Sequence, residues 1–314
     1  GRSAIAYRVS YGIALTVTGP FGDPSEYADD LIDFATFCAR HSWTPVFYSV
    51  HKSQRAELAK AGWDSLDVGT EMVVNPNEWQ TRGKKWQDVR TAINKAKRDG
   101  ITDVLTTFKE APFSVQTQIR EISAQWAGKK ALPEMGFTLG GVDELIDSRV
   151  RLLYAVDGNG KVLGVTSWLP TYRDGTIIGW TLDFMRHRTD SVNGIMEFLI
   201  ARMAERLRDE GNVEFMSLSA APLAGMGSNE SEHEESEVLR HALQMVADIM
   251  EPAYGFHSLF RFKLKFHPDE EKVYICYPDA AKLPQISLAV AQAYVPSLTP
   301  AEAMRFVRTI APRD

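Results

Sequence analysis

The chain has few of the residues that would cross-link it or hold a metal. It contains two cysteines, Cys38 and Cys276, among 314 residues. A disulfide-stapled scaffold and a cysteine-rich metal site are therefore excluded. No segment reaches the roughly 18 apolar residues that a membrane-crossing helix needs. The seven histidines show no metal-ligand spacing, so we expect no metal.

An excess of positive charge is also missing. The 35 Lys and Arg residues are outnumbered by 41 Asp and Glu residues, which gives a net charge of −6. A dedicated nucleic-acid-binding protein is disfavoured, and any such contact would need a local basic patch. With 7 Trp, 10 Tyr and 15 Phe the chain is too aromatic to be disordered. Its length predicts one large or two medium domains.

The order of predicted elements indicates an α/β (α+β) protein. Strands are expected at 6–17, 44–50, 66–74 and 101–106, alternating with helices at 25–40, 51–61, 84–98 and 113–126. A segment rich in Gly and Pro, 129–141, predicts a division into domains 1–128 and 129–314. The second range predicts a hairpin at 150–156 and 162–169, strands at 176–184, 213–218, 256–264 and 272–277, helices at 192–208 and 235–250, and a helical tail at 279–311.

This order in the second half matches the core of acetyl-coenzyme A-dependent acyltransferases. In that fold the loop after the central strand cradles the cofactor pyrophosphate with a glycine-rich backbone. Here the loop Met185–Gly194 has a single glycine and carries the acidic Asp190. Coenzyme A binding is therefore disfavoured, and no cofactor is expected.

Residues 82–98 form a strongly basic segment. Seven basic residues oppose only Asp88, while Trp86, Val89, Ile93 and Ala96 recur at helical spacing and are expected to face the core. The charged face is either a solvated helix surface or a surface that follows the phosphates of a polyanion; the acidic balance of the chain favours the polyanion. The candidate contacts are Lys84, Lys85, Arg90, Lys95, Lys97 and Arg98.

The end of the central strand, Leu182–Arg186, carries two charged residues. Alternation predicts that Asp183 lies on the opposite face from Leu182 and Phe184, with Arg186 close enough to pair with it. The pair is either a structural ion pair or part of a crevice. In a crevice the aspartate can hold an ammonium group and the arginine a phosphate or developing oxyanion.

A second cationic segment lies at 260–266. If it is a strand, period-2 alternation places Arg261, Lys263 and Lys265 on one face, where they repel one another unless they meet an anion. The alternative is the exposed face of a half-buried sheet. Ser217 and Ser219 end a strand beside the same crevice and suit hydrogen bonding better than nucleophilic attack. The glutamate-rich run 229–237 predicts a solvated loop without a catalytic role.

Several of these segments together resemble one family. Gly22-Asp23-Pro24, the helix 84–100, Leu182–Arg186, Ser217–Leu223, Tyr254–Phe266 and Tyr274–Pro278 are similar to motifs of the soluble catalytic region of bacterial aminoacyl-phosphatidylglycerol synthases. This family includes the multiple peptide resistance factors. The resemblance spans residues 7 to 278 with order and spacing kept. Trp126, Phe137–Gly141 and Ser167–Pro170 resemble an actinobacterial branch.

The resemblance implies a fold, an activity and a location. The fold is two tandem acetyltransferase-like domains joined by a basic helix, as in Fem-type peptidyltransferases. The activity is transfer of a lysyl or alanyl group from aminoacyl-tRNA to a hydroxyl of a membrane lipid, phosphatidylglycerol or a diacylglycerol. Such transfer changes membrane charge and resistance to cationic peptides. The family also implies an N-terminal transmembrane region in the full-length protein and a place at the cytoplasmic face of the bacterial membrane.

The resemblance and the residue patterns together give a set of expected roles. Asp183 is expected near the donor ammonium or the attacking hydroxyl, and Arg186 and Lys263 near the lipid phosphate and the oxyanion. Glu251 is a further candidate acid or base. The candidate substrate-binding residues are Lys265, Arg261, Ser219 and Tyr254, and the six cations of the basic helix would bind tRNA. Two alternatives stay open: a coenzyme A-dependent N-acyltransferase and a non-catalytic RNA-binding module.

Overall fold

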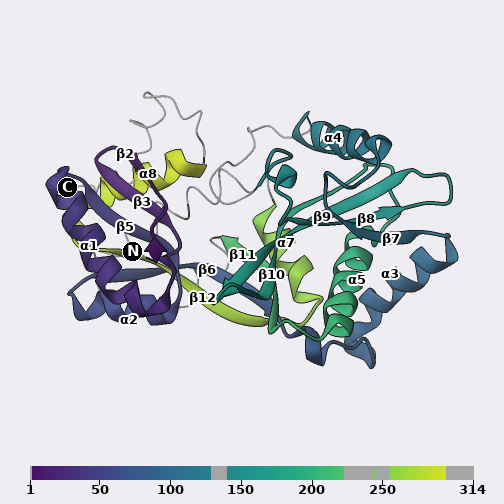
Figure 1. Ribbon diagram of the computed structural model, residues 1–314, viewed down its shortest axis with the longest axis horizontal. Coiled ribbons are helices and arrows are strands. Elements are labelled where there is room, and N and C mark those ends of the chain that lie inside the picture. Colours follow the sequence, from purple (N-terminus) through teal and green to yellow (C-terminus); the bar gives the residue numbers. More distant parts are fainter. Residues whose placement is uncertain (1, 129–139, 223–243, 245–254, 295–314) are drawn as a thin grey trace.

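Strand β6 (Asp64–Val74) runs through the middle of the molecule and belongs to both of its halves (Figure 1). It pairs antiparallel with β12 (Asp269–Tyr277) along one edge and with β11 (Phe215–Pro222) along the other. One sheet of ten strands therefore extends across the whole molecule. The structure, a computed structural model, describes residues 2–128, 140–222, 244 and 255–294.

The strands of this sheet follow an order that differs from their order in the chain. Across the sheet they are β2 (Tyr7–Ser10), β3 (Ile13–Val17), β5 (Thr44–Val50), β12, β6, β11, β10 (Thr176–His187), β9 (Val162–Arg173), β8 (Arg151–Val156) and β7 (Thr102–Thr106). A separate two-stranded sheet joins β1 (Ser3–Ala4) and β4 (Phe21–Gly22).

Helices cover the sheet at both ends (Figure 1). The α-helices are α1 (Tyr27–Arg40), α2 (Lys52–Lys60), α3 (Gln87–Arg98), α4 (Phe113–Gly128), α5 (Ile195–Glu210), α7 (Phe256–Leu264) and α8 (Leu283–Tyr294). Short 3-10 helices lie at Pro24–Glu26, Pro76–Glu78, Lys84–Trp86, Glu144–Ile146 and Ala280–Lys282.

Three apolar clusters hold these layers together. One lies under α1 and α2 and includes Phe34 and Phe47. A second packs α3 and α5 on one face of the strands β8–β10, around Trp168 and Leu199. A third packs α4 against the opposite face of the same strands, around Ile119 and Phe184. The strand β8 and the first part of β9, Val162–Trp168, are consequently buried on both faces.

The expected division at 128/129 stays a prediction, but the two ranges are interleaved in space. β7 and α3, from the first range, contact β8 and α5 of the second. In the other direction, α8 contacts β3, and the hydroxyl of Tyr294 lies 2.8 Å from that of Tyr48. The two halves therefore exchange segments as well as sharing β6.

Most predicted elements are confirmed. β5 occupies the predicted 44–50, and the helix 84–98 begins with a 3-10 turn and continues as α3. Its predicted core residues Trp86, Val89 and Ala96 are buried, and Ile93 packs against the same cluster. Apart from Gln244, the helix predicted at 235–250 lies outside the described residues, as does the acidic run 229–237.

The strand predicted at 256–264 is wrong, because this segment is helix α7. Gly255, with φ 63°, begins the helix, and the ring of Phe262 meets that of Phe266 one turn later at 5.5 Å. Alternating Phe and Lys fits a strand by pattern alone. Tertiary contacts instead favour the helix, because in the helix Lys263 is buried and donates to backbone carbonyls.

Candidate functional site

The site lies where β10 and β11 separate. The two strands pair in parallel only over Gly179–Thr181 and Phe215–Ser217, although both continue beyond. Each then has an irregular register: β10 between Leu182 and Met185, and β11, against β6, between Ser217 and Ala220. Such bulges bend a strand and redirect its side chains. Of the charged residues predicted from the sequence, Asp183 lies in the first irregularity, and Lys263 of α7 binds carbonyls at the second.

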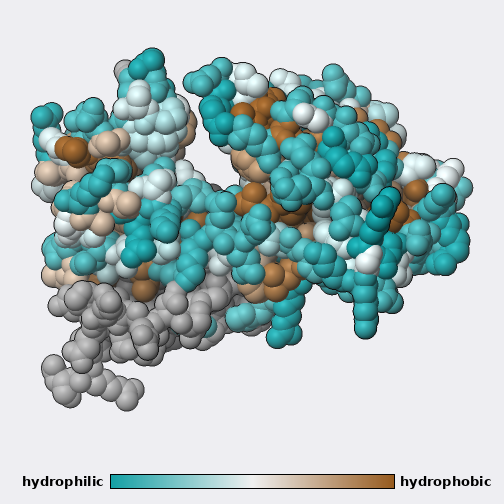
Figure 2. All heavy atoms as spheres, turned by 90° about the horizontal axis from the view of Figure 1, so that it is seen from below, coloured by the Kyte–Doolittle hydropathy of each residue, from teal (hydrophilic) through white to brown (hydrophobic). Residues whose placement is uncertain are grey.

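A cavity of about 530 Å³ opens beside the second half of β10. Its walls come from Arg186 and its neighbours on β10, from the loop 189–194, from the start of α5, from Trp126 near the end of α4, and from α7. Of the predicted charges, Arg186 lines this cavity, whereas Asp183 and Lys263 are not among its lining residues. On the face seen in Figure 2, apolar side chains gather near the middle of the molecule, within a mainly hydrophilic surface.

Asp183 occupies the bulge of β10 and is largely buried. Its Oδ1 accepts a hydrogen bond from the backbone N–H of Gly140 at 2.8 Å. Burial raises the pKa of Asp183, and the nearby Glu144 adds to this, while the Gly140 bond and the charge of Arg186 oppose it. The carboxyl group is therefore a better proton acceptor than an exposed aspartate would be.

Because of this bulge, the predicted orientation of the side chains of β10 around Asp183 is wrong. Leu182 belongs to the cluster under α5, whereas Phe184 belongs to the cluster under α4. The two residues therefore do not share a face opposite Asp183, as simple alternation required. The extra residue in β10 shifts the alternation, which no sequence pattern here signalled.

Arg186 is only 6% exposed and is held by α4. Its Nη1 donates to the hydroxyl of Ser123 at 2.5 Å, and its guanidinium carbon lies 4.1 Å from the ring of Trp126 and 4.5 Å from that of Phe184. The structural ion pair considered for Asp183 and Arg186 is not among the ion pairs of the described residues, and Arg186 acts on Asp183 through space. A buried guanidinium at a cavity wall is suited to binding an anion.

Lys263 points from α7 toward β11. Its Nζ donates to the backbone carbonyls of Ser219 and Ala220, both at 3.2 Å, and the residue is 3% exposed. Burial lowers the pKa of Lys263 to about 7, while the negative charge of Glu71 opposes this change. The side chain therefore titrates near neutrality, as an ordinary surface lysine would not.

The other two cations of this segment go elsewhere, because a helix does not place alternate residues on one face. Lys265 forms an ion pair with Glu197 of α5, with Nζ 2.7 Å from Oε1. Arg261 is exposed to solvent. The prediction that Arg261, Lys263 and Lys265 share one face is therefore wrong.

Ser217 and Ser219 stabilise the bulge of β11 through hydrogen bonds. Ser219 has φ 65°, its hydroxyl donates to the carbonyl of Leu182, and its N–H donates to the hydroxyl of Ser217 at 3.0 Å. Ser219 thereby links β11 to β10 where the strands separate. Glu251 and Tyr254, the remaining predicted site residues, lie outside the described part of the chain.

Sequence reasoning missed Glu71 and His51. Glu71 lies on β6 and accepts a hydrogen bond from Ser217 Oγ at 2.5 Å, while His51 Nε2 lies 3.2 Å from its other oxygen. The available signal was a single charged residue inside the otherwise uncharged end of a strand, Val68–Val74. Its partners are distant in sequence, so the pattern alone could not place it in the site.

Two charged side chains of the loop that precedes α5 bind residues outside the loop. Asp190 pairs with Lys161 at 2.7 Å, and Arg188 donates to the carbonyl of Val162 at 2.7 Å. Gly194, with φ 91°, ends the loop at the start of α5. The loop 189–194 lines the cavity, whereas Asp190 is paired and is not among the lining residues, so the expectation that this loop is unsuited to a pyrophosphate stays a prediction.

The six cations of the basic helix have different surroundings. Lys84, Lys85, Lys97 and Arg98 are exposed. Arg90 instead donates to the carbonyls of Thr81 and Gly83, the first at 2.6 Å, and so secures the turn before the helix. Lys95 pairs with Asp99 at 2.9 Å.

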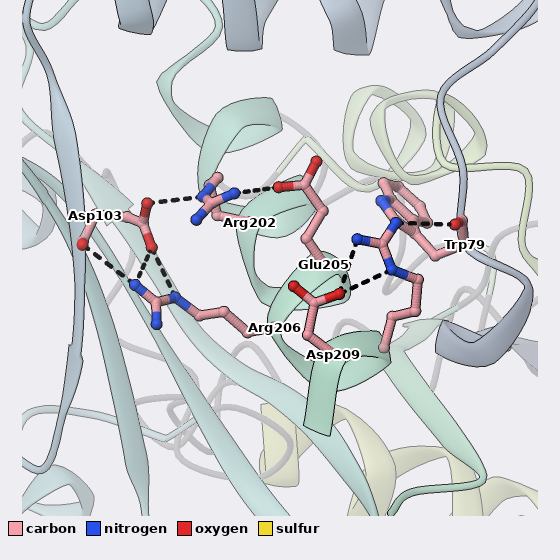
Figure 3. Close-up of polar contacts among 7 residues, drawn as sticks. Trp79, Asp103, Arg202, Glu205, Arg206 and Asp209 are labelled. Atoms are coloured by element: carbon pink, nitrogen blue, oxygen red, sulfur yellow. Dashed lines mark hydrogen bonds and ion pairs between the residues drawn. The ribbon is translucent and has the colours of Figure 1, made fainter. Parts of the chain in front are cut away.

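The neighbouring helix α5 offers little additional positive charge. Arg202 and Arg206 both bind Asp103 of β7, and Arg202 also binds Glu205 (Figure 3). Arg208 pairs with Asp209 at 2.8 Å and donates to the carbonyl of Trp79. These arginines are matched by carboxylates, so the basic surface is concentrated on the 84–98 segment.

Two general features concern membranes and metals. None of the helices within the described ranges is long and apolar enough to cross a membrane. Within the same ranges, no three His, Cys, Asp or Glu side chains are grouped as a metal site.

The ten-stranded sheet, in which β10 and β11 pair only briefly before they separate, is that of a tandem acetyltransferase-like protein of the α/β class. The chain belongs to the family described as phosphatidylglycerol lysyltransferase, C-terminal, whose model matches residues 1–277. The family predicted from the motifs is thereby confirmed.

Individual relatives agree with this assignment. An uncharacterized protein of Corynebacterium glutamicum is 39% identical over 294 residues, which are 93% of this chain and 36% of that protein. The lysylphosphatidylglycerol biosynthesis bifunctional protein LysX of Gordonia bronchialis is 27% identical over 293 residues, 92% of this chain and 25% of that protein. The chain thus spans only about a quarter to a third of the length of these relatives.

A solved structure supports the fold. The structure titled L-PGS from Bacillus licheniformis matches with a TM-score of 0.78 at 22% identity, covering 94% of this chain and 86% of that one. At this identity the match shows the fold alone.

Proposed function

We propose that this chain transfers an aminoacyl group, lysyl or alanyl, from aminoacyl-tRNA to a hydroxyl of a membrane lipid, phosphatidylglycerol in the first instance. The observation that carries the proposal is the presence of the half-buried Asp183 and the buried Arg186 and Lys263 at or beside the bulges of β10 and β11. Family membership supports it, since the matching model describes a phosphatidylglycerol lysyltransferase.

The proposed reaction exchanges one ester for another. The lipid hydroxyl attacks the aminoacyl carbonyl, a new ester forms, and the bond to the tRNA ribose breaks. The proton leaves the lipid hydroxyl and is returned to the ribose oxygen. Because the donor ester is already activated, no ATP or cofactor is required. Catalysis then depends on positioning, proton transfer and stabilisation of the oxyanion.

The proposed roles follow the local chemistry. Asp183, with its raised pKa, would hold the donor ammonium group or accept the proton of the hydroxyl. The cations Arg186 and Lys263 would stabilise the lipid phosphate and the developing oxyanion. Glu251 as acid or base, and Lys265, Arg261, Ser219 and Tyr254 as substrate-binding residues, remain part of the proposal. Of these, Lys265 and Ser219 already have partners within the protein.

The tRNA would be held outside the crevice, on the basic segment. Its exposed cations are Arg82, Lys84, Lys85, Lys97 and Arg98, and a polyanion would neutralise them. Lys95 and Arg90 would contribute less, because Asp99 and two carbonyl groups already bind them. With a lipid acceptor, this reaction would take place at the cytoplasmic face of the membrane.

A single assay tests the function. The purified chain is incubated with radiolabelled lysyl-tRNA or alanyl-tRNA and vesicles containing phosphatidylglycerol or diacylglycerol, and the lipids are extracted. Label in a lipid supports the proposal and names both substrates. tRNA binding without transfer by the wild-type chain would support the RNA-binding alternative, and acylation only with an acyl-coenzyme A donor would support the N-acyltransferase. The Asp183→Asn variant is the negative control.

A further inference from the structure

Glu71 lies in the strand that both halves share, and it connects them. Its Oε2 is 3.2 Å from Nε2 of His51, the residue that precedes α2 in the smaller half. Its Oε1 accepts a hydrogen bond from Ser217 of β11 at 2.5 Å. Although burial opposes it, these partners and the charge of Lys263 lower the pKa of Glu71, so the side chain is a carboxylate at neutral pH.

A short series of contacts leads from Glu71 to Lys263. Ser217 donates to Glu71 and accepts the N–H of Ser219 at 3.0 Å. That bond accompanies the positive φ of 65° at Ser219, a backbone conformation that non-glycine residues adopt only when their surroundings enforce it. In this conformation the carbonyls of Ser219 and Ala220 accept from Lys263 Nζ at 3.2 Å.

We propose that Glu71 is a positioning residue for the transfer reaction: through Ser217 it fixes the turn of β11 that binds Lys263, and through its charge it favours the protonated form of Lys263. His51 holds the Glu71 carboxylate in place from the other half of the molecule. The assignment of a catalytic part to Lys263 rests on the proposed function, whereas the influence of Glu71 on Lys263 does not.

The charges around Lys263 support this assignment. Two neutral carbonyls bind its Nζ, and among the described residues Glu71 of β6 is the charged group that acts on it. Glu71 in turn faces His51, and His51 Nδ1 lies 3.7 Å from Glu271 of β12, whose side chain is exposed. A lysine with a pKa of about 7 is only partly protonated at neutral pH, so one nearby carboxylate decides its charge.

The test measures the titration of Lys263 directly. Lysine labelled with ¹³C at Cε and ¹⁵N at Nζ is incorporated, and the Lys263 signal is assigned by its absence in Lys263→Met. In Glu71→Gln, which keeps the shape but loses the charge, the midpoint should fall by about one pH unit or more. Glu271→Gln is the matched control, since it removes the other carboxylate near His51, and its midpoint should stay at the wild-type value.

Ser217→Ala separates charge from geometry. It removes the hydrogen bonds that hold the turn and leaves the carboxylate, so transfer should fall while the Lys263 midpoint moves less than in Glu71→Gln. Thermal unfolding monitors folding of each variant. If Glu71→Gln does not fold, Glu71→Met, which has similar length and no charge, takes its place in the same titration.

Lipid aminoacylation is then followed against pH. If the midpoint of Lys263 falls by one pH unit, the alkaline limb of the pH–rate profile of Glu71→Gln should move to lower pH by the same amount. At a pH above the Lys263 midpoints of both proteins, Glu71→Gln should then transfer about tenfold more slowly than the wild type. An unshifted Lys263 signal in the charge-removing variant would overturn the inference. Absence of lipid labelling by the wild type would instead overturn the proposed function, and the titration would still report on Glu71.

Discussion

Gly140 and Asp183 fit against each other so closely that no side chain can stand between them. The N–H of Gly140 donates to Asp183 Oδ1 at 2.8 Å, and a Cβ on Gly140 would lie 2.0 Å from Oδ2. The contact is with the end of a side chain, which can rotate away. A substitution at Gly140 therefore acts on the position of the carboxylate more than on the backbone.

We expect Gly140→Ala to lower lipid aminoacylation by roughly tenfold or more, because the Asp183 carboxylate has to leave its place. The melting temperature should change little. Gly158→Ala is the matched control, since a Cβ at Gly158 meets nothing within 4 Å. Equal transfer rates for Gly140→Ala and Gly158→Ala would show that transfer does not depend on the position of the Asp183 carboxylate.

Asp183→Asn should lower the transfer rate and raise the melting temperature at pH 7. Transfer should fall by about 10²-fold, the scale of a lost proton-transfer group. The pKa of Asp183 is raised in the folded protein, so its ionisation destabilises the fold as pH rises through that pKa. The variant should therefore melt at a higher temperature than wild type at pH 7, and the difference should shrink toward pH 4. A lower melting temperature at pH 7 would contradict the raised pKa.

Arg186→Ala should reduce both activity and stability. Transfer should fall by about 10²-fold if the guanidinium binds an anion in the transition state. The side chain also fills the space between Trp126 and Phe184 and donates to Ser123, so its removal should cost about 2 kcal/mol of unfolding free energy. Urea unfolding measures that cost. Arg186→Lys keeps the charge, and wild-type transfer by this variant would show that the fork of the guanidinium is not needed.

Four exposed cations should account for the salt dependence of tRNA binding. Changing Lys84, Lys85, Lys97 and Arg98 together to Ala should flatten the plot of log affinity against log salt by roughly 0.7–0.9 for each lost contact. Transfer from a minimal aminoacyl-RNA mimic that cannot reach the helix should survive. Arg206→Gln on α5 is the control, because Asp103 already binds that arginine. An unchanged affinity and slope for the quadruple variant would identify the helix as merely solvated.

The link between His51 and Glu71 should show as a pH-dependent stability. The hydrogen bond with Glu71 and the nearby carboxylates raise the pKa of His51 in the folded protein. Its stabilising contribution is therefore complete below the ordinary pKa of histidine and is lost as pH rises through the raised value. His51→Gln should lower the melting temperature at pH 5.5 and have a smaller effect at pH 9. A loss that is the same at both values would point to packing alone.

Local patterns predicted most of the elements, because they depend on residues close together in the chain. The apolar spacing of Trp86, Val89 and Ala96 is one example, because all three side chains are buried as predicted. The segment Leu182–Arg186 was also predicted to end a central strand, and it lies in the second half of β10, between β11 and β9. These inferences need only the period of a helix or a strand.

The details of the site depended on contacts that no local pattern contains. The bulges at Asp183 and Ser219 shift the alternation of β10 and β11 by one residue each. Lys263 became part of the site because a helix could bury it against carbonyls of β11, from 43 and 44 residues away in the chain. Glu71 was missed for the same reason: its partners, His51 and Ser217, come from two other segments.

The central position of β6 affects how the protein can be divided. Both edges of this strand are hydrogen-bonded, to β12 on one side and to β11 on the other. A fragment starting at residue 129 would contain β11 and β12 without the strand between them, and each would expose a bare edge open to aggregation. A cut between the two acetyltransferase-like halves therefore removes strand pairing from both, because the strand they share, which carries Glu71, is hydrogen-bonded on both sides.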